Sequence, residues 1–255
     1  MSTLDDRPPM YVGSLPLPWT HSRFLRWFVP LSLWGVAMLA AVGAWGMRSP
    51  GPGQWQLMSG PAEPVEIEGF AVAEPYAMIV TPEGETVLVV EEGKFGAQER
   101  FAAFDGHTVR ARGWLIERDG RRMLELLDTP LIAATRLPLP AITPDPRRPD
   151  PVTLAGELMD GKCHLGVMKP GDGRGHRACA ILCMRGGIPP LLQVTTDDGD
   201  ERLLLVHGPE GGRCPDAITE RAGEPIALTG RLGWIGDLPT LEVAGPTALA
   251  GVAAR

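Results

Sequence analysis

Two stretches of the sequence, well separated along the chain, follow one pattern: residues 86–126 read TVLVVEEGKFGAQERFAAFDGHTVRARGWLIERDGRRMLEL, and residues 202–243 read RLLLVHGPEGGRCPDAITERAGEPIALTGRLGWIGDLPTLEV. The glycine and leucine of GWL match those of GRL, and Leu124-Glu125 matches Leu241-Glu242. Shorter stretches upstream correspond as well, 75–84 with 190–199 and 65–69 with 152–156. A repeat of this length predicts that the chain contains one structural module twice.

Each copy has the same expected order of elements. In the first copy the residue pattern predicts strands at 65–72, 76–81 and 86–91, a helix at 97–104, and a hairpin of 108–117 with 122–127 that turns at Asp119-Gly120. Three strands, a helix and two strands resemble the oligonucleotide/oligosaccharide-binding (OB) barrel, which has five strands. The expected fold is therefore mainly β, with OB-like modules at 65–136 and 152–248. This fold hosts many functions and implies none by itself.

Composition supports this fold class and excludes one group of partners. The chain of 255 residues has 32 glycines and 26 prolines, as expected for many short strands joined by turns, and 44% apolar residues are enough for a buried core. The formal net charge of −7 argues against nucleic acid as a partner, because phosphate binding needs clustered lysine and arginine.

The N-terminal part predicts a membrane anchor. Residues 27–47, WFVPLSLWGVAMLAAVGAWGM, carry no charge and are long enough to span a bilayer, with Pro30 expected in the first turn. Arg23 and Arg26 precede this segment, so the positive-inside rule places the N-terminus in the cytoplasm. The expected organisation is a cytoplasmic tail at 1–23, a transmembrane helix at 24–47, a linker at 48–64 and a proline-rich linker at 137–151. A cleaved signal peptide and a buried core helix are the alternatives.

The two copies differ between their first and second strands. The first copy has only residues 70–74 there, whereas the second has an expected insert, 157–189, that reads ELMDGKCHLGVMKPGDGRGHRACAILCMRGGIP. This Cys/His-containing insert is called the cassette below. It resembles a segment of uncharacterised membrane-anchored bacterial proteins. That resemblance implies a bacterial envelope setting and no activity. Together with the positive-inside rule it leads to the expectation of a bacterial inner membrane with the C-terminal head in the periplasm.

The cassette contains the candidate site. A short helix is expected at 176–185, on which His176, Cys179 and Cys183 share one face at spacings i, i+3 and i+7. The loop can bring Cys163 over that face. These four residues predict a metal site, since thiolate and imidazole suit zinc, and thiolate with imidazole or thioether suits copper(I). The C-x3-C pair also resembles the copper pairs of membrane-anchored copper-delivery proteins and of the dinuclear copper centre, although Gly187 and Pro190 replace the latter's following ligands.

Two other interpretations of the cysteines stay open. One is structural disulfides among Cys163, Cys179, Cys183 and Cys214, with Cys214 joined to a cysteine of the cassette. The other is a reactive thiol at Cys179, beside His176 near a helix start. Further polar and aromatic residues fit ordinary structural roles: Asp160 in a turn, Lys162 as a solvated side chain, Met168 and Met184 in packing, His107 and His207 at strand ends, Trp114 and Trp234 in the fourth strands.

These observations predict an accessory or binding protein rather than an enzyme. It would sit in the inner membrane and either bind copper or zinc at the cassette or dock on an envelope partner. The alternatives are a thiol-based redox protein or enzyme that uses Cys179 and Cys183, and a glycan- or protein-binding platform whose disulfides serve stability alone.

Overall fold

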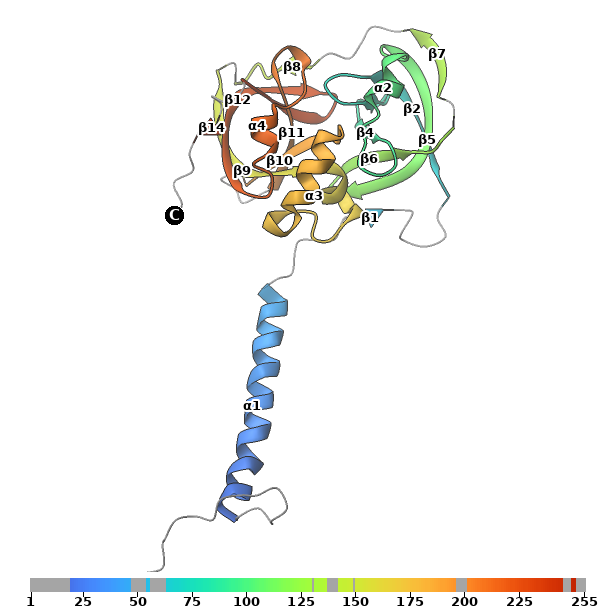
Figure 1. Cartoon of the computed structure of the whole chain (residues 1–255). Helices are drawn as coiled ribbons and strands as arrows, with labels where there is room; N and C mark the ends of the chain where they lie inside the picture. Colours follow the sequence, from blue (N-terminus) through green and yellow to red (C-terminus); the bar gives the residue numbers. More distant parts are fainter. Residues whose placement is uncertain are drawn as a thin grey trace, which may run out of the picture. The chain divides into compact units, whose positions relative to one another are not determined.

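The computed structural model of the chain describes residues 19–46, 54–55, 63–129, 131–136, 142–148, 150–195, 201–244 and 249–250. The chain divides into two compact units, Met1–Pro50 and Gly51–Arg255. The second unit, called the head below, holds every described strand (Figure 1). The two units are described separately.

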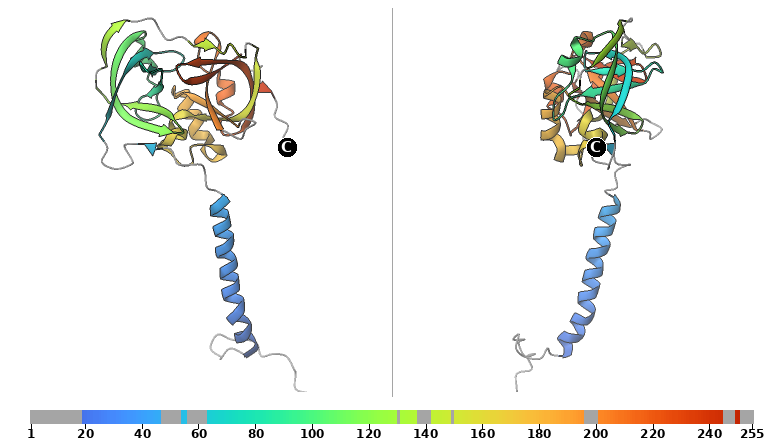
Figure 2. Two further views of the ribbon diagram at one scale, coloured as in Figure 1. Left: turned by 180° about the vertical axis from the view of Figure 1, so that it is seen from behind. Right: turned by 90° about the vertical axis from the view of Figure 1, so that its right-hand side faces the viewer.

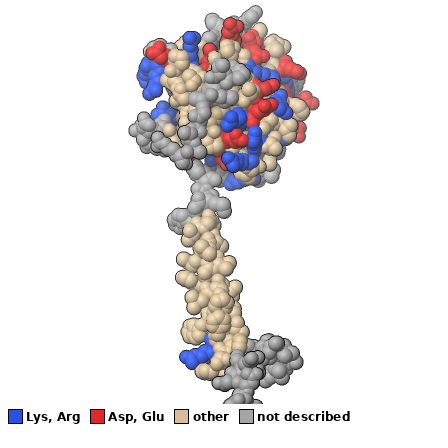
Figure 3. Space-filling model, turned by 60° about the vertical axis from the view of Figure 1, so that its left-hand side comes forward, with Lys and Arg blue, Asp and Glu red and all other residues tan. Residues whose placement is uncertain are grey.

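The first unit contains one long helix, α1 (Trp19–Gly46). Its segment Trp19–Ala44 is long and apolar enough to cross a membrane, a property that signal sequences share. The space-filling view shows an uncharged surface along its length, with basic side chains near one end (Figure 3). The helix begins earlier than the sequence predicted. Residues 19–23, assigned to the tail, are therefore helical, and Pro30 lies inside the helix rather than in its first turn.

The first barrel closes around five strands: β2 (Val65–Val72), β3 (Met78–Val80), β4 (Thr86–Val90), β5 (His107–Arg118) and β6 (Arg121–Leu126). Neighbouring strands run antiparallel except β4 and β6, which are parallel, and the pairings β2–β5 and β5–β6 complete the circle. The short helix α2 (Gln98–Ala102) connects β4 to β5. The β5–β6 hairpin turns at Asp119-Gly120, both at positive φ, as the sequence predicted.

The second barrel repeats this arrangement with β9 (Val152–Asp160), β10 (Pro190–Thr195), β11 (Glu201–His207), β12 (Pro225–Ile235) and β13 (Leu238–Val243). The parallel pair is now β11 and β13, and α4 (Asp216–Thr219) takes the place of α2. The prediction of a mainly β head with two five-stranded barrels is confirmed, and both barrels are compatible with the OB order.

Matching glycines allow the same close approach in both barrels. A Cβ atom on Gly113 of β5 would lie 2.2 Å from the backbone oxygen of Glu125, and one on Gly230 of β12 would lie 2.3 Å from that of Glu242. Contacts this short leave no room for any side chain. The repeated glycine seen in the sequence therefore reflects the tight crossing of the fourth and fifth strands.

Short strands extend each barrel. β1 (Gln54–Trp55) and β7 (Ile132–Arg136) pair with β5, while β8 (Thr143–Pro144) and β14 (Leu249–Ala250) pair with β12. β1 lies in the segment that the sequence assigned to a linker, and β8 lies in the proline-rich linker. β7 and β8 belong to different sheets, so the described residues contain no continuous sheet through that linker.

The two barrels lie side by side and share a core (Figures 1 and 2). Alternate residues of β3 and β4 in one barrel, and of β10 and β11 in the other, point out of their own barrel into one buried cluster. That cluster includes Leu88, Val90, Leu191 and Leu205. The remaining residues of these strands fill the interior of their own barrel. Strands buried on both faces read as continuous apolar runs, which explains TVLVV and LLLV.

Between β9 and β10 the chain forms the π-helical turn η2 (Cys163–Val167) and helix α3 (Gly173–Arg185). β9 runs on to Asp160, so the excursion begins at Gly161 and not at 157 as the sequence predicted. α3 begins at Gly173, three positions before the predicted start at 176, and ends at Arg185 as predicted. Cys163, Leu165 and Cys183 belong to the core shared by the two barrels, so the excursion packs at the interface rather than on the second barrel alone.

Candidate metal centre

Three cysteines of the excursion lie close together in space, one near its start and two on its helix. Cys163 opens η2, while Cys179 and Cys183 stand one turn apart on α3. Their Sγ atoms all lie within 4.8 Å of one another. Cys163 and Cys183 are buried and Cys179 is half-buried. A second group, formed by Asp160, Cys163 and His176, also has one ligand atom from each residue within 4.8 Å of the others.

Asp160 links the two groups. It is fully buried at the end of β9, where its Oδ1 accepts a hydrogen bond from the backbone N–H of Cys163 at 2.9 Å. Its Oδ2 lies 2.8 Å from Nε2 of His176. This contact, opposed by burial, raises the pKa of His176 above its usual range. The aspartate thus fixes both the start of η2 and the orientation of the imidazole.

The first barrel contributes a cation to this cluster. Lys94, in the connection between β4 and α2, places Nζ 2.7 Å from Sγ of Cys179 and 3.5 Å from Sγ of Cys183. Its loop is held against the end of α3 because the backbone N–H of Gly96 donates to the Gly186 oxygen at 2.9 Å. The hydrogen bond to Cys179 raises the pKa of Lys94, so the ammonium stays charged beside the sulfurs.

The buried thiols of Cys163 and Cys183 shift each other's pKa in opposite directions. The thiol of Cys163 hydrogen-bonds to Cys183, and this contact, together with burial and the neighbouring Asp160, raises the pKa of Cys163. The same hydrogen bond, supported by Lys94 and opposed by burial, lowers the pKa of Cys183 to about 7. Of the two thiols, Cys183 is therefore the one that ionises more readily.

A buried ion pair supports the cluster from the side of the first barrel. Lys162 is 2% exposed, and its Nζ lies 3.5 Å from Oε2 of Glu125, which is 3% exposed. The same ammonium donates to the backbone oxygens of Glu91 at 2.9 Å and Gly93 at 2.8 Å. Burial lowers the pKa of Lys162 and raises that of Glu125, and their attraction opposes both shifts. Two hydrogen bonds and one ion pair of this ammonium thus attach the excursion to the first barrel.

Several residues of interest lie outside the cluster. His164 is buried against Arg118, and burial together with this cation lowers its pKa to about 4. Met184 packs in the interior of the second barrel. Met168 approaches Cys179, with 3.9 Å between Sδ and Sγ. Trp114 is half-buried and Trp234 is 38% exposed, at different positions on the fourth strands.

The expected disulfides are not formed. All four cysteines lie in the described part of the chain and all are free thiols. Cys214 is buried apart from the other three, and its backbone N–H donates to the hydroxyl of Tyr76 at 3.0 Å. The predicted bond between Cys214 and the cassette is therefore wrong for this structure, because the chain before α4 places Cys214 against a tyrosine of the first barrel instead.

Sequence reasoning brought together Cys163, His176, Cys179 and Cys183, and the structure places all four in the two overlapping groups. It missed Asp160, which it assigned to a turn, and Lys162, which it treated as a solvated side chain. It also missed Lys94, whose only sequence signal is its position in the repeat. Chemically, three thiols beside a fixed imidazole form a site that could hold a soft metal ion.

Comparison of the chain with protein-family models, curated proteins and solved structures finds no match. The functional interpretation therefore depends on the geometry of this site.

Proposed function

We propose that the chain is a membrane-anchored accessory protein whose head binds one soft metal ion through Cys163, Cys179 and Cys183. The single observation that supports this proposal best is the mutual approach of the three sulfurs to within 4.8 Å. A tetrahedral zinc with Zn–S bonds of about 2.3 Å needs sulfurs roughly 3.8 Å apart, so a small adjustment of side chains is sufficient.

His176 is the proposed fourth ligand. Its Nε2 atom contacts Asp160 at 2.8 Å, so Nδ1 would be the ring nitrogen that binds a metal. Ligating histidines usually donate their second nitrogen to a carboxylate, which fixes the tautomer and raises the basicity of the ligand. Asp160 fits that supporting role better than the role of a ligand, because its second oxygen holds the Cys163 N–H.

The charges around the cluster favour zinc over copper(I). Three thiolates and Zn²⁺ give a net charge of −1, which the adjacent ammonium of Lys94 neutralises. With Cu⁺ the same site would keep an excess negative charge in a largely buried position, at a cost in free energy. Copper(I) has one supporting contact of its own, the thioether of Met168 near Cys179.

The test uses the full-length chain purified in detergent. Metal content per mole is measured by mass spectrometry after growth with zinc and with copper. We expect about one zinc per chain, with strong loss in Cys179→Ser and Cys183→Ser. Cys214→Ser is the matched control, because it removes a buried thiol from the same barrel outside the cluster. Equal metal content in all three variants would overturn the proposal.

The fourth ligand is tested by a second pair of variants. His176→Asn should weaken zinc retention against a chelator, whereas Met168→Leu should leave it unchanged. If copper is the retained metal, and Met168→Leu weakens its retention while His176→Asn does not, the site is a copper(I) site. Chelation should also lower the melting temperature of the wild type, since binding to the folded state stabilises it by mass action.

A second candidate function is thiol–disulfide exchange. Its supporting observation is that Cys179, the half-buried and therefore most accessible sulfur of the cluster, has the Lys94 ammonium at 2.7 Å. The Cys179 thiolate would attack a partner's disulfide, forming a mixed disulfide and releasing one partner thiolate. Cys183 would then displace the other, so that the partner gains two electrons and this chain is oxidised to a disulfide.

The two candidate functions predict different results with oxidised glutathione. Exchange requires that metal-free wild type loses two free thiols and that Cys179→Ser forms no mixed disulfide. A metal site predicts instead that bound zinc protects all three thiols from oxidation. Stoichiometric zinc that blocks the reaction would therefore exclude exchange as the resting function.

The proposed location is the bacterial inner membrane, with the N-terminus in the cytoplasm and the head in the periplasm. Support comes from the length of α1 and from Arg23 and Arg26 near its start. A reporter that is active only in the periplasm, fused after Arg255, should be active. Activity of a cytoplasmic reporter at the same position would overturn this topology, and release of the head from washed membranes would indicate a cleaved signal.

A further inference from the structure

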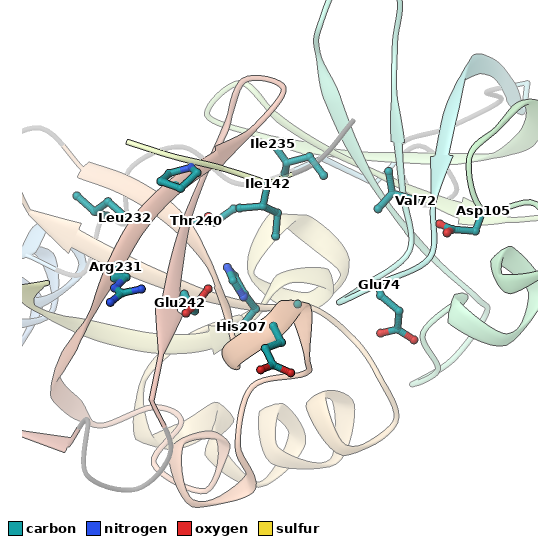
Figure 4. Close-up of a pocket in the computed structure, with 14 residues that line it drawn as sticks. Val72, Glu74, Asp105, Ile142, His207, Arg231, Leu232, Ile235, Thr240 and Glu242 are labelled. Carbon is teal, nitrogen blue, oxygen red and sulfur yellow. The ribbon is translucent and has the colours of Figure 1, made fainter. Parts of the chain in front are cut away.

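A cavity of about 440 Å³ lies at the barrel–barrel interface and shares no lining residue with the metal cluster. Its walls come from both barrels (Figure 4). Glu74 and Asp105 belong to the first barrel, while His207, Thr240 and Glu242 belong to β11 and β13 of the second. These residues belong to neither group of the metal cluster.

His207 presents an unused acceptor to this cavity. The side chain is 1% exposed, and its Nδ1 lies 2.8 Å from the backbone oxygen of Gly208. A carbonyl oxygen can only accept, so Nδ1 carries the hydrogen and Nε2 of the neutral ring has a free lone pair. Within the described part of the chain that Nε2 atom has no hydrogen-bond partner, and neither does the hydroxyl of the fully buried Thr240. Burial lowers the pKa of His207, which keeps the ring neutral.

The charge of the lining is predominantly negative. Glu74, Asp105, Glu210 and Glu242 line the cavity against a single cation, Arg231, the cross-strand neighbour of Glu242. The groups of acidic, histidine and cysteine side chains close enough to share one metal ion, among the described residues, include none of these. The cavity therefore suits an extended organic cation better than a metal ion.

The internal repeat relates the cavity to the buried ion pair at the other end of the interface. Glu242 is the counterpart of Glu125: Glu125 pairs with Val90 across β4 and β6, and Glu242 pairs with His207 across β11 and β13. In the first barrel the glutamate receives the ammonium of Lys162. In the second barrel the cavity lies at the corresponding position beside Glu242. The ion pair of Lys162 with Glu125 thus shows that an ammonium group fits the position beside this glutamate.

We propose that the interbarrel cavity binds a small organic amine, whose primary ammonium takes beside Glu242 and His207 the place that Lys162 takes beside Glu125. Nε2 of His207 and the hydroxyl of Thr240 accept hydrogen bonds from the ammonium, and Glu242 balances its charge. The carbon chain lies along Val72, Ile142 and Ile235. A second ammonium would reach Glu74 or Asp105 on the opposite wall, so a diamine or polyamine fits better than a monoamine.

The experiment measures calorimetric binding of 1,4-diaminobutane and spermidine to the full-length chain in detergent, with 1,4-butanediol as the uncharged analogue. Saturable binding of at least one amine, without binding of the diol, is the expected result. Glu242→Gln should weaken it at least tenfold, and Thr240→Val should weaken it severalfold. Glu83→Gln, an exposed carboxylate outside the cavity, is the matched control and should change nothing.

Circular dichroism and the melting temperature establish that each variant is folded before its affinity is compared. Amine binding that is non-saturable, or equally affected by Glu83→Gln and Glu242→Gln, would show attraction to the acidic surface alone and overturn the proposal. No binding to the folded wild type would also overturn it. Metal content is measured in the same samples and should be unchanged in Glu242→Gln. The metal site and the amine site are therefore tested independently of each other.

Discussion

The two ends of the barrel–barrel interface are related by the repeat but are completed differently. At one end Glu125 is covered by the excursion between β9 and β10, which brings Lys162 and the three converging thiols. At the other end the corresponding connection, between β2 and β3, is short, and Glu242 faces a cavity. Duplication thus supplied two equivalent positions, and one lengthened connection made them chemically distinct. Four measurements test whether the two ends differ in this way.

The largest contrast concerns two cysteines of the second barrel. The pKa of Cys183 is lowered to about 7 in the cluster, whereas burial raises that of Cys214 to about 12. Thiolate absorbance of the chelated, metal-free protein should therefore show a step near pH 7 that Cys183→Ser removes and Cys214→Ser retains. The lowered pKa of Cys183 favours the folded state as pH rises from about 7 toward 9, whereas the raised pKa of Cys163 opposes folding at pH values above 9. A step that persists in Cys183→Ser would contradict this assignment.

The second prediction concerns the buried ion pair. Lys162→Met should lower the free energy of unfolding by about 3–5 kcal/mol, because it leaves Glu125 buried and uncompensated. Adding Glu125→Gln should restore much of the loss in denaturant titration. Glu242→Gln alone should lower the free energy of unfolding by less than about 1 kcal/mol, because it does not leave a buried lysine without its counter-ion. Equal losses in Lys162→Met and Glu242→Gln would mean that the two ends are not distinct.

The third prediction uses the matched glycines. Gly113→Ala and Gly230→Ala should each destabilise the head by about 1–3 kcal/mol, because each Cβ would overlap a backbone oxygen. Denaturant midpoints of the two variants should agree closely. A large difference between them would show that the barrels, although alike in topology, do not close with the same strain.

The smallest effect is expected at a hydrogen bond between the barrels. The hydroxyl of Thr86 in β4 donates to the backbone oxygen of Ile235 in β12 at 2.5 Å. Thr86→Val keeps the shape and leaves that oxygen without this donor, so the cost should be about 0.5–1.5 kcal/mol. Thr153→Val is a suitable control, because Thr153 pairs with Thr229 on an exposed face. The control should change stability by much less.

Local sequence patterns predicted the barrels well, because each strand is specified by its own alternation or apolar run. The Asp119-Gly120 turn and the start of β2 followed directly from such signals. The end of β9 was not predicted, because the segment 157–160 has acidic residues at both ends and acidic residues are more common in loops than in strands. Asp160 is acidic and yet fully buried, since it has a histidine and a backbone N–H as partners.

The candidate site was only partly predictable for a physical reason. Helical spacing aligns His176, Cys179 and Cys183 from sequence alone. Lys94 reaches the same sulfurs only because the two barrels share a core, and no local pattern encodes that packing. The cavity could not be predicted for the same reason, because its described walls come from five strands and several connecting segments of both barrels.

The shared core also has a consequence for the order of events during synthesis. The first barrel leaves the ribosome before β10 and β11 exist, and domains emerge N-terminal end first. Until those strands arrive, the outward-facing Leu88 and Val90 have nothing to cover them. The nascent chain therefore passes through a stage with one closed barrel and a bare apolar face. Lys94 and Glu125 of that barrel find their partners Cys179 and Lys162 only when the excursion is made, so the cysteine cluster forms in the final step of assembly.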